Sequence, residues 1–175
     1  AVSISFSADA PSFKLKDIFK KTVDSDDIYG NGVVVVEFWS TTCEACKEEL
    51  PHLNDLFLEY REDGLIAIAI SVDSARLEKN VKPFIQGRGY KFKVLLDPDK
   101  KAYTGFHVAS IPMTFIIDED GKIVYTHLGY SAGDEKILEE AKGIVVTKRL
   151  KSLNSFIENA IREKFAARNR PFPSK

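Results

Sequence analysis

The sequence is poor in cysteine, in net charge and in long apolar runs, and each shortage excludes a class of protein. Its 175 residues include 2 cysteines, so it is not a small scaffold held together by several disulfides. The formal net charge of −1 gives no global attraction to nucleic acid or to an anionic membrane. No apolar run of about 18 residues could span a bilayer, and no signal-peptide pattern is present. The length and the 44% hydrophobic content instead fit a domain with a full-sized core.

Methionine is also scarce, since Met113 is the only one and the chain begins at Ala1. Two interpretations of this start remain open. The chain was trimmed for expression, or it is a mature protein from which a signal or anchor has been removed.

Strand-like and helix-like segments alternate along most of the chain. Residues 33–38 are apolar at almost every position, which predicts a strand buried on both faces. A helix follows, with Leu50, Leu53, Leu56, Phe57 and Tyr60 on one face and Gly64 just past its end. Further strands are predicted at 65–72, 94–96, 113–117 and 123–128, and further helices at 75–87, 99–107 and 134–142. This order predicts an α/β fold with a central mixed sheet flanked by helices. An irregular region at 1–32 precedes it, in which residues 13–15 alternate briefly as a short strand would.

The C-terminal end of the chain has a different character. Residues 144–165 predict a basic amphipathic helix, and Pro171 and Pro173 mark a loose tail. We therefore expect a domain over residues 1–143 and a helical extension over residues 144–175. The apolar face of this extra helix has three candidate roles: packing on its own domain, contacting a partner or a second copy, or lying on an anionic membrane surface.

The two cysteines, Cys43 and Cys46, are three positions apart, and this spacing is the first chemical signal. A disulfide across so short a loop removes little chain entropy, so its value is chemical rather than structural. Thr41 to Glu44 matches the capping box S/T-x-x-E, which predicts Thr41 as N-cap and Cys43 in the first helical turn. Unpaired N–H groups and the helix dipole there stabilise a Cys43 thiolate. Cys46, one turn further in, is expected to be more buried and to resolve mixed disulfides.

Such a dithiol needs a proton acceptor for Cys46, and two carboxylates are candidates. Glu49 lies three residues after Cys46 on the same helical face, and Glu37 interrupts an apolar strand. Burial raises the pKa of a carboxyl, so either can act as a base near neutrality. Glu44 is expected to oppose the adjacent Cys43 thiolate, which favours a reductase over an oxidase.

One pattern resembles the active site of thioredoxin-like proteins: Phe38-Trp39-x-x-x-Cys43-x-x-Cys46-Lys47-x-Glu49-x-Pro51. It is most similar to the TlpA/ResA branch of extracytoplasmic thiol–disulfide oxidoreductases. Residues 10–15, 75–108 and 111–118 resemble that branch's N-terminal segment, its insertion and its cis-proline segment. The resemblance covers roughly residues 8–142 and implies a thioredoxin-like fold with the family-type insertion.

The resemblance assigns roles to individual residues. It implies that Cys43 attacks, that Cys46 resolves, and that Pro112 is the cis-proline that aligns a substrate backbone. Glu49 matches the active-site Glu of the ResA-like proteins, and Glu37 occupies the position of the buried acid of thioredoxins.

Trp39, Thr42 and Ile111 are expected to contact substrate. Thr42 stands where the family usually has Trp, and Ala45 stands where it often has Pro. These departures leave the partner contacts and the redox potential open.

The function implied by the resemblance is electron exchange between this dithiol and protein disulfides, in the reducing direction, as in cytochrome c maturation. No cofactor is implied beyond the redox-active Cys43–Cys46 disulfide. The implied electron donor is a membrane thiol transporter, and the implied location is extracytoplasmic, either periplasmic or membrane-anchored. No nucleic acid partner is expected.

Three other functions fit the sequence less well. A metal site is disfavoured because His52, His107 and His127 form no recognisable ligand spacing with the cysteines. A peroxiredoxin-like peroxidase would accept Ser40, but Val36 stands where its motif has Pro. A passive binding or scaffold module on the same fold would not need the intact Cys-x-x-Cys.

Overall fold

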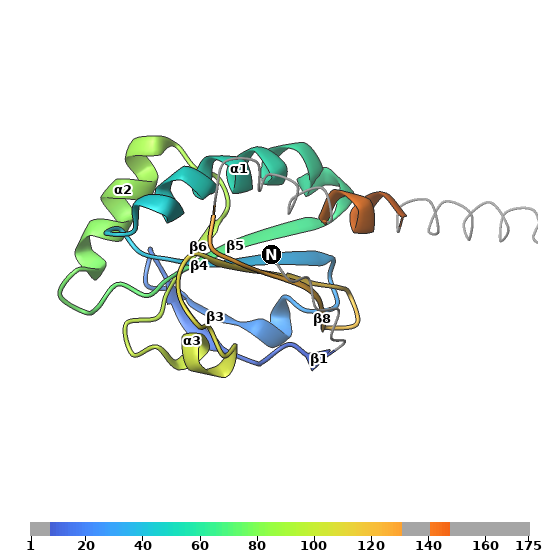
Figure 1. Ribbon diagram of the computed structural model, residues 1–175, viewed down its shortest axis with the longest axis horizontal. Helices are drawn as coiled ribbons and strands as arrows, with labels where there is room; N and C mark the ends of the chain where they lie inside the picture. The colour runs from blue at the N-terminus through green and yellow to red at the C-terminus, as the bar shows by residue number, and fades with distance from the viewer. Residues whose placement is uncertain (1–7, 131–140, 148–175) are drawn as a thin grey trace, which may run out of the picture.

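The computed structural model describes residues 8–130 and 141–147, which form an α/β fold built on an eight-stranded mixed sheet (Figure 1). The strand order is β1-β8-β7-β4-β5-β6-β2-β3. The strands are β1 (Ala8–Asp9), β2 (Lys14–Asp17), β3 (Thr22–Asp24), β4 (Val33–Trp39), β5 (Leu65–Ser71), β6 (Lys93–Leu96), β7 (Met113–Ile117) and β8 (Lys122–Leu128). The helices are α1 (Glu44–Tyr60), α2 (Val81–Arg88) and α3 (Lys101–Gly105), and residues 141–147 are also helical. The predicted sheet flanked by helices is confirmed.

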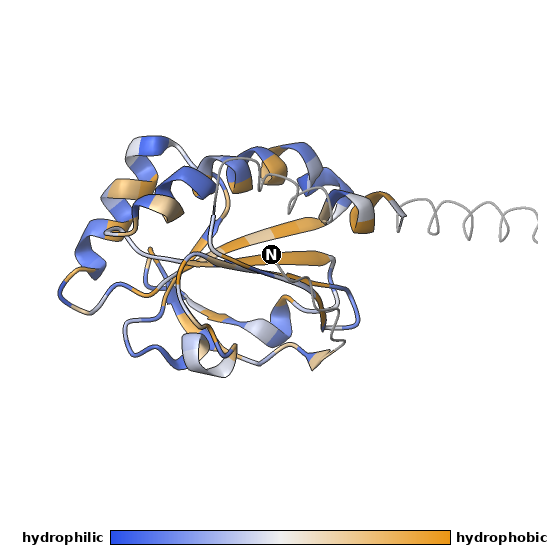
Figure 2. Ribbon diagram, viewed as in Figure 1, coloured by the Kyte–Doolittle hydropathy of each residue, from blue (hydrophilic) through white to orange (hydrophobic). Residues whose placement is uncertain are grey.

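The central strands are buried on both faces, as the apolar runs predicted. Every residue of β4 is buried, and β4 pairs in parallel with β5 and antiparallel with β7. Figure 1 shows α1 and α2 on one face of the sheet and α3 on the other. The alternation of side chains along β4 therefore supplies two cores. Figure 2 shows the apolar character of these inner strands.

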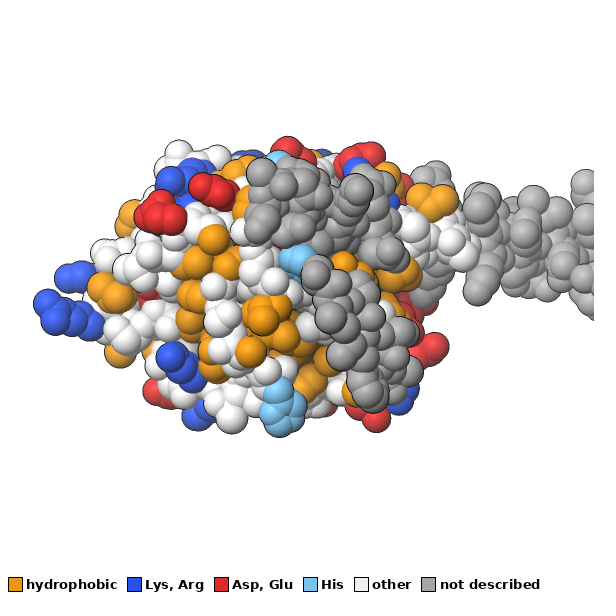
Figure 3. All heavy atoms as spheres, viewed as in Figure 1, with side chains coloured by type: hydrophobic (Ala, Val, Ile, Leu, Met, Phe, Trp, Pro, Cys, Tyr) orange, Lys and Arg blue, Asp and Glu red, His pale blue; other side chains and the backbone are white. Residues whose placement is uncertain are grey.

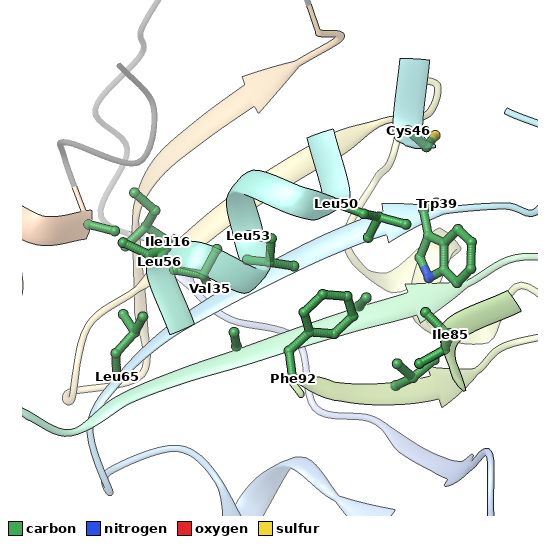
Figure 4. Packing of buried hydrophobic residues seen from close by; sticks show 14 of the residues in the cluster. Val35, Trp39, Cys46, Leu50, Leu53, Leu56, Leu65, Ile85, Phe92 and Ile116 are labelled. Atoms are coloured by element: carbon green, nitrogen blue, oxygen red, sulfur yellow. The ribbon is translucent and has the colours of Figure 1, made fainter. Parts of the chain in front are cut away.

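The core under α1 and α2 supports the end of β4 that leads into the cysteines. Trp39 lies in this cluster with Cys46 and Leu50 (Figure 4). Its ring packs against Phe84 with the ring centroids 5.2 Å apart. The other cluster, toward α3, includes Phe38, which makes an edge contact with Phe115 of β7. The junction between β4 and α1 is thus held from both faces.

A close backbone approach fixes the start of β4. A Cβ atom added at Gly32 would clash with the carbonyl oxygen of Gly64, so no larger residue fits there without movement. Gly64 itself has φ +90, in the left-handed region, and ends the short 3₁₀ turn Arg61–Asp63 that follows α1.

Two sequence-based expectations need correction. Residues 1–32 contain more regular structure than predicted, because β2 and β3 form a hairpin that adds to the edge of β6. The brief alternation at 13–15 falls on β2, but the two strands are only 4 and 3 residues long and each has a single buried residue, Leu15 and Val23, so the hairpin leaves a weak pattern. The helix predicted at 75–87 is shorter, because α2 begins at Val81 after the 3₁₀ turn Glu78–Asn80.

The predicted helix at 134–142 and extension at 144–175 fall mostly outside the described residues. No helix in the described part of the chain is both long and apolar enough to cross a membrane. On the face shown in Figure 3, charged side chains lie mainly around the periphery and apolar ones near the middle.

Candidate active site

Cys43 and Cys46 form a disulfide at the N-terminal end of α1, directly after β4. Their Cα atoms are 5.3 Å apart. Cys46 is 0% exposed and packs in the core beside Leu50, whereas Cys43 is half-buried. Figure 4 shows Cys46 at the start of α1, above the core. An incoming thiol or disulfide can therefore reach Cys43 but not Cys46.

The predicted capping box is wrong, because Cys43 itself is the N-cap of α1. Its Sγ accepts the backbone N–H of Cys46 at 3.2 Å. Thr41 turns away from the helix: its N–H and its hydroxyl donate to the Asp73 carboxylate at 2.8 and 2.7 Å. A capping hydroxyl would accept an N–H of the helix, whereas the Thr41 hydroxyl is directed at Asp73 as a donor, and the same carboxylate also holds the backbone N–H of Thr41. An N–H group still points at the Cys43 sulfur, as thiolate stabilisation requires.

Asp73 is a site residue that the sequence analysis missed. It is buried just beyond the end of β5 and also accepts the Ser71 hydroxyl at 2.8 Å. Ser71 lies opposite Trp39 in the parallel pair, so Asp73 is carried to the segment that leads into Cys43. The signal for it was an acidic residue immediately after the strand that neighbours the cysteine-bearing one.

Two buried carboxyl groups lie on the helix and the strand that flank the disulfide. Glu49 of α1 is 3% exposed and Glu37 of β4 is 1% exposed. Thr114 of β7 donates its hydroxyl to Glu49 Oε1 at 2.9 Å, and it faces Glu37 in the β4–β7 register. Oε1 of Glu37 has no hydrogen-bond partner among the described residues. Burial raises the pKa of Glu37 well above its usual value, and the charge of Glu49 raises it further.

These polar groups continue across the sheet. His127 of β8 is buried and faces Thr114 in the β7–β8 register. A row of Glu37, Thr114 and His127 thus crosses three adjacent strands, with Glu49 above it on α1. Glu37 and Glu49 stand out in the sequence, whereas Thr114, which donates to Glu49 and faces Glu37, does not.

The segment expected to receive a substrate lies at the start of β7. The Ile111–Pro112 peptide bond is cis, as the resemblance implied. Ile111 is half-buried and Thr42 is exposed, so part of each side chain is accessible to a substrate. Trp39 does not: it is fully buried, so the expectation that it contacts substrate is corrected, and it supports the site from the core.

The side chains of Glu44 and His52 interact with neighbouring side chains. The Glu44 side chain is 82% exposed and forms an ion pair with Lys47 at 2.7 Å, so solvent and this cation both screen its charge. His52 stacks on Tyr130, with Nε2 3.0 Å from the phenolic oxygen. Within residues 8–130 and 141–147, no group of three or more His, Cys, Asp or Glu side chains is arranged to hold a metal ion.

Comparison with known proteins places this geometry among thiol–disulfide oxidoreductases. A family model described as the AhpC/TSA family matches residues 7–126, more than half of the chain. Thiol-disulfide oxidoreductase ResA of Bacillus thuringiensis is 36% identical over 121 residues, which are 69% of this chain and 68% of that protein. ResA of Bacillus subtilis is 34% identical over 122 residues, 70% of this chain and 66% of that protein.

A solved structure gives the same indication. The crystal structure of a candidate thiol:disulfide interchange protein DsbE from Chlorobium tepidum superposes with a TM-score of 0.72 at 25% identity. The superposition covers 82% of this chain and 96% of that one. The segment matched by the family model contains both cysteines, Glu49 and Pro112.

Proposed function

Because this chain belongs to the AhpC/TSA family and is a thiol–disulfide oxidoreductase of the ResA type, we propose that it reduces disulfides in protein substrates. The observation that carries the proposal is the asymmetry of the disulfide: a half-buried Cys43 at a helix N-terminus, and a buried Cys46 one turn from a buried carboxyl. An accessible attacking sulfur and a shielded resolving sulfur are what directional exchange requires.

The reaction begins from the reduced dithiol. The Cys43 thiolate, stabilised by the Cys46 N–H, attacks one sulfur of the substrate disulfide and releases the other as a thiolate. Cys46 then gives its proton to Glu49 and attacks Cys43 Sγ, which releases the second substrate thiolate. The two electrons pass to the substrate, and the Cys43–Cys46 disulfide remains.

The two buried carboxyls have different parts in this proposal. Glu49 receives a hydrogen bond at Oε1 from Thr114, which favours the ionised form that can accept a proton. Burial and the charge of Glu49 both raise the pKa of Glu37, so Glu37 is the carboxyl that is held toward the protonated form. We therefore assign the role of base to Glu49, which also receives the Thr114 hydrogen bond.

We propose the substrate contact, the electron donor and the location from the family resemblance. We place the substrate backbone along Ile111 and the cis-proline Pro112, beside Thr42. A membrane thiol protein would restore the reduced dithiol, and the location would be extracytoplasmic, with a role like that in cytochrome c maturation. A protein or membrane contact through residues 144–175 is part of the same proposal.

The redox potential of the Cys43–Cys46 pair tests the direction. It is measured by equilibrating the protein with dithiothreitol or glutathione buffers of graded ratio. We expect a potential near or below about −250 mV, in the range of thiol reductants. A potential of about −120 to −180 mV would identify an oxidase or isomerase and overturn the proposal.

A further inference from the structure

A single side-chain hydroxyl joins the cis-proline strand to the base on the redox helix. Thr114 lies two residues after Pro112 on β7, is 1% exposed, and donates to Glu49 Oε1 at 2.9 Å. Glu49 is three residues from Cys46 on α1. A hydroxyl has one proton to donate, and here it is given to Glu49.

We infer that Thr114 is a positioning residue for the resolving step, which holds the Glu49 carboxylate toward Cys46 and favours its ionised form. This inference rests on the proposed role of Glu49 as the proton acceptor and extends it to a residue outside the redox helix. Thr114 does not touch substrate in this scheme. It acts through Glu49 alone.

The physical argument concerns a buried carboxylate with little solvent to stabilise it. Glu49 is nearly fully buried, so its ionised form depends on hydrogen-bond donors supplied by the protein. Removal of the Thr114 hydroxyl takes away such a donor and leaves the carboxylate less firmly oriented. A proton acceptor that is displaced or remains protonated slows the transfer from Cys46.

Other titratable groups lie near this hydrogen bond and contribute to the pH dependence of proton transfer to Glu49. Glu37 faces Thr114 from β4 and His127 faces it from β8. Cys46 lies on the same helix as Glu49, and Tyr90 interacts electrostatically with Glu37. Because these groups also lie near Thr114, a change in the pH profile is assigned to Glu49 by comparison with Glu49→Gln.

The test separates the attacking step from the resolving step in the same protein. Fully reduced protein is mixed rapidly with an excess of 5,5′-dithiobis(2-nitrobenzoate) across a range of pH. Attack by Cys43 releases one thionitrobenzoate in a first phase. Resolution by Cys46 releases another in a second phase, and the rate of that phase reports on Glu49.

Thr114→Val keeps the shape of the side chain and removes the donor. We expect its second phase to be about tenfold slower below the midpoint of the pH profile, and the midpoint to rise by roughly one unit. The first phase should keep the wild-type rate. Thr114→Ser, which restores a hydroxyl, should return the midpoint to the wild-type value, and Thr126→Val on β8 is the matched control.

Each outcome distinguishes the positioning role of Thr114 from the proposed role of Glu49 as the base. If Thr114→Val keeps the wild-type second phase while Glu49→Gln abolishes its pH dependence, the inference fails and Glu49 remains the base. If Glu49→Gln also keeps the wild-type profile, the proposed role of Glu49 fails. If Thr114→Ser behaves like Thr114→Val, packing rather than the hydroxyl is responsible, and the inference fails. Should Thr114→Val not fold, Thr114→Ala is compared with Thr114→Ser in the same way.

Discussion

Replacement of Glu37 by Gln should change the pH dependence of stability in a defined direction. Burial and the charge of Glu49 raise the pKa of Glu37 well above its usual value near 4.5 in the folded protein, whereas the unfolded chain leaves it near that value. Between the two values the folded state holds a proton that the unfolded state has lost. The contribution of Glu37 is therefore most favourable below about pH 4.5, and it falls as the pH rises toward the folded-state pKa.

The size of the effect follows from linkage. Within this window the free energy of unfolding falls by about 1.4 kcal/mol for each pH unit because of this one group. Gln has no proton to lose, so Glu37→Gln should lack that slope. The stability of Glu37→Gln relative to wild type should therefore rise steadily with pH through the window.

The measurement is urea unfolding at a series of pH values with the disulfide intact, followed by the fluorescence of Trp39, the protein's 1 tryptophan. Glu48→Gln, at an exposed position on the same helix as Glu49, serves as the matched control and should follow wild type. Parallel stability curves for wild type and Glu37→Gln would refute the reasoning. They would show that Glu37 titrates alike in both states.

Two further substitutions give sharp expectations. Gly32→Ala should lower the free energy of unfolding by about 1–3 kcal/mol, because the new methyl group meets the carbonyl oxygen of Gly64; unchanged urea denaturation would contradict this. Glu44→Gln should lower the Cys43 thiol pKa, by less than about half a unit because Lys47 and solvent already screen the charge. Thiolate absorbance against pH measures that shift, and an unchanged or raised pKa would refute the opposition of Glu44 to the thiolate.

Much of the central architecture could be predicted from the sequence because burial leaves a direct pattern there. The valines at 33–36 and the alternating Ile and Ala of 66–70 have no polar face, and such runs occur where helices cover both sides of a sheet. The position of Cys43 and Cys46 between a buried strand and a helical pattern likewise indicated that the pair lies at the start of that helix. Glu37 was noticeable because a charge within such a strand demands an explanation.

The features of the fold and the site that the sequence did not predict depend on contacts between distant segments. Thr41 fits a helix cap on local grounds, and only the fold reveals that Asp73, 32 positions away, competes for its hydroxyl. Thr114 is an ordinary strand residue in the sequence, and its proposed role depends on its hydrogen bond to Glu49 of the helix that packs over it. In the same way, the alternation at 13–15 indicates one short strand, but its pairing with β3 and with the edge of β6 does not show in the sequence.

The position of Cys43 at the cap of α1 gives the backbone a spectroscopic reporter of electron transfer. Its Sγ bonds covalently to Cys46 and accepts the Cys46 amide proton through space. After reduction the ionised sulfur is a much stronger acceptor than a disulfide sulfur, so the same amide is held more firmly. Amide hydrogen exchange at Cys46 should therefore slow when the protein is reduced and follow the ionisation of Cys43, which allows the charge on the sulfur to be read from a neighbouring peptide group.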